Sequence, residues 1–246
     1  LRVSFDPGAT SNADHFLNQV LRPRFQYNGS HPEVHELVTI ASDGELYGHH
    51  QPFRDRFLDR LMDGALSGTP LNATFPALWL KEHPASQTIA IRNQTSWSCH
   101  HGVARWSDGC DCTPHSDWKK PFFAAMQWLG GEIDRIYLAM TAGLVRDAWE
   151  LRHQYIHVVL EQVSAEELIQ AHALGTLDAE QVRGLDLILR AQFERQRMFT
   201  SCGWFFEDFD RIEPRNNVAY AAQAVLLTQQ ATGVDLSPAA LRDLAL

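Results

Sequence analysis

The 246-residue sequence has few cysteines, no run of basic residues and no long apolar segment, and each shortage argues against a class of protein. Four Cys are too few for a dense disulfide framework, so a reducing compartment is favoured and we expect a cytoplasmic protein. Lys and Arg number 21 against 30 Asp and Glu, a net charge of −9, so we expect no nucleic-acid partner. The longest apolar stretches are shorter than the roughly 20 residues that span a bilayer, so we expect no membrane partner.

The sequence changes in texture near residues 115–121. Before this point, two short β-branched runs, 36–42 and 88–91, predict buried strands, and the apolar spacing over 53–66 predicts a helix. After it, apolar residues recur at helical spacing, and we expect helices over 122–138, 147–162, 165–174, 178–199 and 217–230 and a short one from 237. We therefore predict an α/β region over 1–116 and a mostly α, helical domain over 117–246.

Four side chains able to exchange protons or bind substrate follow the first predicted strand: Asp43, Glu45, His49 and His50. General acid–base chemistry needs carboxyl groups at the rim of a pocket, and strand ends commonly supply such positions. The alternative is a polar turn in which Gly44 and Gly48 serve the backbone and the acidic side chains are solvated.

The segment 41–50 resembles the fourth signature motif of glycoside hydrolase family 57, Thr-Asp-Gly-Glu followed by an aromatic residue and Gly, with Ser42 in place of the usual Thr. The resemblance implies a retaining α-glucan hydrolase or glucanotransferase built on an incomplete (β/α)7 barrel. It implies that Asp43 is the general acid/base and that Glu45 has a supporting electrostatic role. The first region would then be a remnant of such a barrel, joined to the helical domain.

A second resemblance covers more of the chain, and the two together span roughly residues 35–230. The segments 93–106, 108–112 and 199–206 resemble the uncharacterised C-terminal domain that follows the family 57 catalytic region in a group of bacterial proteins. That domain has no established activity, so this resemblance identifies related proteins but does not imply a function.

One element of family 57 chemistry is missing. A retaining glycosidase needs a second carboxyl group about 5–5.5 Å from the first, but the nucleophile motif does not occur before Asp43, where Glu33 and Glu36 are the only Glu residues. We therefore expect that the chain, which starts at Leu1 without a visible export signal, is the C-terminal part of a longer enzyme whose N-terminal catalytic half is missing, or a relative without the chemistry.

Three of the four cysteines crowd the irregular loop between 93 and 121, and thiolates and imidazoles are the ligands that a structural zinc ion prefers. A zinc site made by Cys99, Cys110, Cys112 and Cys202 would join the loop to the helical half. The alternatives are disulfide bonds and buried, unlinked thiols.

Aromatic residues are dense around these cysteines, and pyranose rings commonly stack on aromatic faces. We expect Trp97 and Trp106, together with His49 and His50, to contact an oligosaccharide or polysaccharide.

Three functional hypotheses remain. The leading one is the C-terminal part of a family 57-like enzyme that acts on α-glucan or a related oligosaccharide through Asp43. The second is a metal-dependent sugar deacetylase with Asp43, His49 and His50 as ligands. The third is a non-catalytic accessory module for a partner catalytic barrel.

Overall fold

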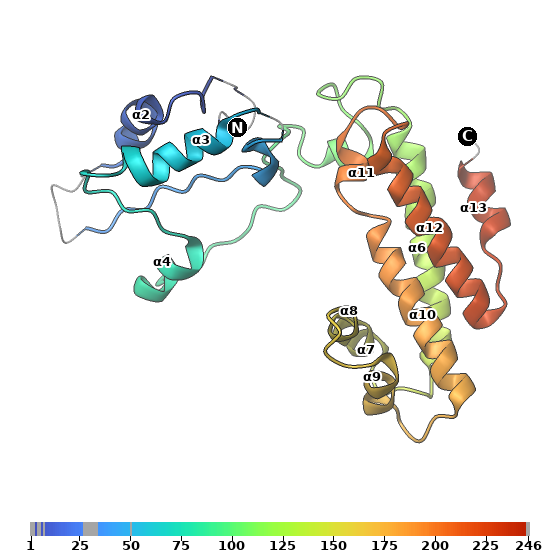
Figure 1. Cartoon of the computed structure of the whole chain (residues 1–246). Coiled ribbons are helices and arrows are strands. Elements are labelled where there is room, and N and C mark those ends of the chain that lie inside the picture. Colours follow the sequence, from blue (N-terminus) through green and yellow to red (C-terminus); the bar gives the residue numbers. More distant parts are fainter. Residues whose placement is uncertain (1–2, 4–5, 7, 27–33, 50, 245–246) are drawn as a thin grey trace. The chain divides into compact units, whose positions relative to one another are not determined.

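The computed structural model describes residues 3, 6, 8–26, 34–49 and 51–244, and in this part of the chain every regular element is a helical segment (Figure 1). Two isolated bridges, Tyr47–Gln51 and Val145–Ala173, are the only β pairings among the described residues. The predicted α/β architecture, and with it the barrel remnant, is therefore wrong.

The two predicted strands, 36–42 and 88–91, have no regular structure. Ile89 and Ile91 have 90% and 85% of their surface exposed. β-Branched residues favour a strand only where a neighbouring strand pairs with it and covers one face, and the described residues supply no such neighbour.

The chain forms two compact units, residues 1–93 and 94–246. In the first unit the predicted helix over 53–66 is present, as α3 and the wider π-type turns of η4 that continue it. The elements of this unit are α2 (Ala13–Phe16), η1 (Leu17–Leu21), η2 (Arg22–Arg24), η3 (Gly44–Leu46), α3 (Arg54–Asp59), η4 (Arg60–Ala65) and α4 (Pro76–Glu82).

A small core holds the first unit together. Phe16 and Phe57 meet edge to face with ring centroids 5.4 Å apart, and Leu17 and Leu61 are buried beside them. The Arg60 guanidinium binds the Asp14 carboxylate at 2.9 Å across the same two helical segments. Both groups are more than half exposed, so this ion pair adds at most about 1 kcal/mol and burial of the apolar side chains does most of the stabilising.

The second unit is a helical domain, as the sequence predicts. Its elements are α5 (Ala104–Ser107), α6 (Lys119–Thr141), α7 (Ala148–Gln154), α8 (Ile156–Val159), α9 (Ala165–His172), α10 (Ala179–Arg197), α11 (Cys202–Phe205), α12 (Ile212–Thr232) and α13 (Ser237–Leu244). The three long helices, α6, α10 and α12, pack against one another, and α13 packs on α6 (Figure 1).

Side chains that cap the backbone fix where these helices begin. Asp178, the predicted cap of α10, accepts from the backbone N–H of Gln181, whose side chain in turn accepts from the Asp178 N–H. Ser164 and Glu167 make the same reciprocal pair at α9. Each of these reciprocal pairs, called a capping box, provides acceptors for two backbone N–H groups that the first turn leaves without a partner. A cap of this kind stabilises the helix by about 1 kcal/mol.

The start of α6 meets two short helices, α5 and, through the ring of Trp204, α11. Trp204 of α11 is 2% exposed and stacks on Phe122 of α6 at 4.7 Å, while Phe205 lies against Trp106 of α5 at 5.9 Å. This aromatic packing holds the irregular loop before α6 on the helical core. None of the helices in the described ranges is long and apolar enough to cross a bilayer.

Candidate metal centre

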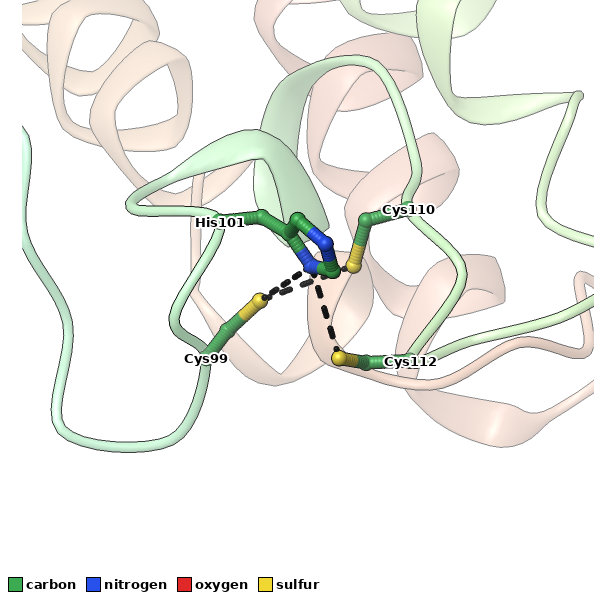
Figure 2. Close-up of side chains that lie close together, drawn as sticks. All are labelled: Cys99, His101, Cys110 and Cys112. Atoms are coloured by element: carbon green, nitrogen blue, oxygen red, sulfur yellow. Dashed lines mark hydrogen bonds between the residues drawn. The ribbon is translucent and has the colours of Figure 1, made fainter.

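Four side chains from the loop around α5 converge on one point: Cys99, His101, Cys110 and Cys112 (Figure 2). Their ligand atoms all lie within 4.8 Å of one another. Cys99 and His101 precede α5, and Cys110 and Cys112 follow it. The two pairs therefore share one pattern, in which one residue separates two ligands, and α5 brings the pairs together.

Three of the six distances between the ligand atoms are close to the edges of a tetrahedron around zinc. With Zn–S about 2.3 Å and Zn–N about 2.0–2.1 Å, the S–S and S–N edges are about 3.8 and 3.6 Å. The Sγ atoms of Cys99 and Cys110 are 3.6 Å apart, and the Nδ1 atom of His101 lies 3.5 Å from the Sγ atoms of both Cys99 and Cys112. The four cysteines of the chain form no disulfide, so three sulfur atoms and one imidazole nitrogen are available to a metal.

Backbone turns of the loop are closed by short-range contacts. The Ser96 hydroxyl accepts from the Cys99 N–H at 3.2 Å and donates to the Gly102 carbonyl at 2.8 Å. Gly109 has φ +82°, and a Cβ there would lie 2.6 Å from the hydroxyl of Ser116. Glycine is required at this position because any side chain would push the backbone next to Cys110 away from the turn at Ser116.

The environment favours a thiolate at Cys110. Burial raises its pKa, but hydrogen bonds from the Cys112 N–H, Cys99 and Thr113 outweigh this effect and bring the pKa to about 7. The pKa of Cys112 is raised, by desolvation and by the neighbouring Cys99 and Cys110 sulfurs. Thiolates that repel one another in this way are stabilised together when a cation binds between them.

The structure brings together three of the four predicted zinc ligands and replaces the fourth. Cys202 is exposed at the start of α11 and is not a member of the cluster. His101 takes the fourth place. The sequence carried a signal for it, because Cys99-x-His101 has the same one-residue spacing as Cys110-x-Cys112.

The predicted catalytic residues lie in the first unit. Asp43 and Glu45 are exposed, at and just after the start of η3, and His49 is exposed beyond it. His50 lies outside the described residues. A cavity of about 350 Å³ is lined by Ser42, Tyr47 and apolar side chains, but neither Asp43 nor Glu45 lines it.

The two predicted sugar-contacting tryptophans differ in exposure. Trp97 has 51% of its surface exposed, two residues before Cys99. Trp106 is half-buried against Phe205, and its indole N–H is buried without a hydrogen-bond partner. Trp97 is therefore the more exposed of the two.

Residues 115–246 match the model of a family described as a domain of unknown function, DUF3536. The match covers more than half of the chain. The chain belongs to the DUF3536 family. The match begins just after Cys112, so the four-ligand cluster immediately precedes the DUF3536 domain and α5 packs on its first helix, α6. No curated protein and no solved structure matches the chain.

Proposed function

We propose that this chain is a non-catalytic, zinc-stabilised module of a family 57-like carbohydrate-active protein, and that it supports a partner catalytic barrel. The observation that carries the proposal is the convergence of Cys99, His101, Cys110 and Cys112, whose ligand atoms lie within 4.8 Å of one another, with three of the distances between them at 3.5–3.6 Å. Four protein ligands leave no open position for a substrate or an activated water, and closed sites of this kind are structural.

Zinc suits this donor set better than other common ions. Three thiolates and an imidazole are soft or borderline ligands, which disfavour magnesium and calcium, and zinc has no geometric preference that opposes a tetrahedron. The Nδ1 atom of His101 faces the sulfur atoms, so its proton would lie on Nε2.

The carbohydrate part of the proposal rests on the resemblance of 41–50 and 93–112 to family 57 proteins and their C-terminal domain. An accessory role fits the positions of Asp43 and Glu45, which are exposed and do not line the nearby cavity, since a general acid acts at the rim of a pocket. Trp97, with 51% of its surface exposed, is the aromatic residue offered to a sugar ring.

The test has two parts, both with the 246-residue chain. End-labelled α-linked oligosaccharides incubated with wild type and Asp43→Asn should give no product with either protein. Electrophoresis through gels that contain an α-glucan should show retarded migration, reduced in Trp97→Ala and unchanged in Trp128→Ala, a control at an exposed tryptophan of α6. If the wild-type protein migrates equally in gels with and without the glucan, the carbohydrate role is contradicted.

Catalysis through Asp43 is the second candidate, favoured by the cavity that Ser42, the residue before it, helps to line. Cleavage or transfer by wild type that is lost in Asp43→Asn would establish this candidate and overturn the non-catalytic proposal.

A further inference from the structure

Lys119, the first residue of α6, has a buried positive charge. Its side chain is 0% exposed, and its ammonium donates to the carbonyl oxygen of Arg105 in α5 at 2.9 Å. The ammonium also lies 5.7 Å from the ring centroid of Trp118. Among the ion pairs within 4 Å that the described residues form, none includes Lys119.

This position is unfavourable for a cation in the absence of a negative partner. Burial removes the ammonium from water, and the N-terminal end of a 23-residue helix carries a partial positive charge. Desolvation and the nearby guanidinium of Arg105 lower the pKa of Lys119 to about 8, while Cys110 and Glu207 act in the opposite direction. The buried lysine therefore needs negative charge close by, and Cys110 is one source.

A chain of contacts joins Lys119 to the cluster. The Lys119 N–H donates to the Ser116 carbonyl at 3.0 Å, and the Ser116 hydroxyl lies 3.3 Å from that of Thr113. The Thr113 hydroxyl lies 3.8 Å from the Sγ atom of Cys110, and both hydroxyl residues are buried. On the other side, Arg105 belongs to the helix that separates the two ligand pairs. The Lys119 backbone is thus joined to Cys110 through Ser116 and Thr113, and its ammonium to the helix between the two ligand pairs through the Arg105 carbonyl.

The charge of the filled centre completes the argument. A divalent ion with three thiolates and a neutral imidazole carries a net charge of about −1. We propose that Lys119 is the countercharge of this metal–thiolate centre and raises its affinity for a divalent, thiolate-binding cation. The inference rests on the proposed zinc site. It makes Lys119 a positioning residue whose charge is unfavourable in the metal-free protein and favourable once the metal is bound.

The test compares Lys119→Met and Lys119→Gln with Lys120→Met, a control at the exposed neighbour on the same helix. Zinc affinity is measured by competition with a chromophoric chelator, and the thermal midpoint of the metal-free protein by circular dichroism. Both Lys119 variants should bind zinc about tenfold more weakly, as outer-shell changes commonly do, while their metal-free midpoints stay equal to or above that of wild type. The glutamine variant keeps a donor for the Arg105 carbonyl, so a loss there isolates the charge.

Two results would overturn the inference while leaving the zinc site standing. One is wild-type zinc affinity in either Lys119 variant. The other is a metal-free midpoint below that of wild type in both Lys119 variants, which would make Lys119 a packing residue whose charge does not serve the metal site. Failure of the wild-type protein to bind zinc would instead refute the proposed function itself.

Discussion

The substitution Cys110→Ser removes one ligand from the proposed zinc centre, and its effect on stability can be estimated. A ligand that binds only the folded state adds about 4 kcal/mol when its free concentration is about 1,000 times its Kd. For a unit the size of residues 94–246, 1 kcal/mol corresponds to about 2–4 °C in Tm. Zinc should therefore raise the Tm of the wild-type protein by about 8–16 °C, and Cys110→Ser should abolish most of this rise.

The assay is thermal unfolding followed by circular dichroism, with zinc and with a chelator. Cys202→Ser is the matched control, because Cys202 is exposed and lies outside the cluster. It should retain the full zinc-dependent rise in Tm. An equal rise in Cys110→Ser and wild type, or its loss in Cys202→Ser, would refute the assignment of the ligands.

Two further predictions concern pH and packing. Cys110 has a pKa of about 7 and must be a thiolate to bind metal. Zinc affinity, measured by chelator competition, should therefore fall as the pH falls from 8 to 6. An affinity that does not change with pH would contradict thiolate ligation. A methyl group at Gly203 would overlap the buried side-chain amide of Asn217, so Gly203→Ala should lower the free energy of unfolding by about 1–3 kcal/mol in urea titrations. Gly175→Ala, which meets no atom within 4 Å, should change it by about 0.5 kcal/mol or less, and equal effects at the two positions would contradict the packing around α11.

The helices of the second unit could be predicted because periodicity and capping agree there. The apolar spacing over 122–138 lies within α6, and Asp178 caps α10 as expected. The prediction of two strands was wrong for a physical reason. A β-branched run such as 36–42 has strand propensity, but it carries no information about whether a partner strand exists. In the described residues it has none.

The metal centre could be predicted in part. Cys99, Cys110 and Cys112 are close in sequence, so a shared site was expected from the loop alone. The sequence favours Cys202 as the fourth ligand because it would join the loop to the helical half, but the spacing does not say which of the neighbouring imidazoles completes the site. The rings of His100 and His101 lie 3.8 Å apart between centroids at a tilt of 41°, and the folded loop decides which of the two imidazoles points at the sulfur atoms.

The central claim is tested most directly by counting metal. The protein is loaded with zinc, freed of unbound ion by gel filtration and analysed for zinc and sulfur. The account predicts one zinc ion per chain for wild type and Cys202→Ser, and a loss of bound zinc when His101 is replaced by Ala. Wild-type protein that retains no zinc, or a His101→Ala variant that retains as much as wild type, would contradict it.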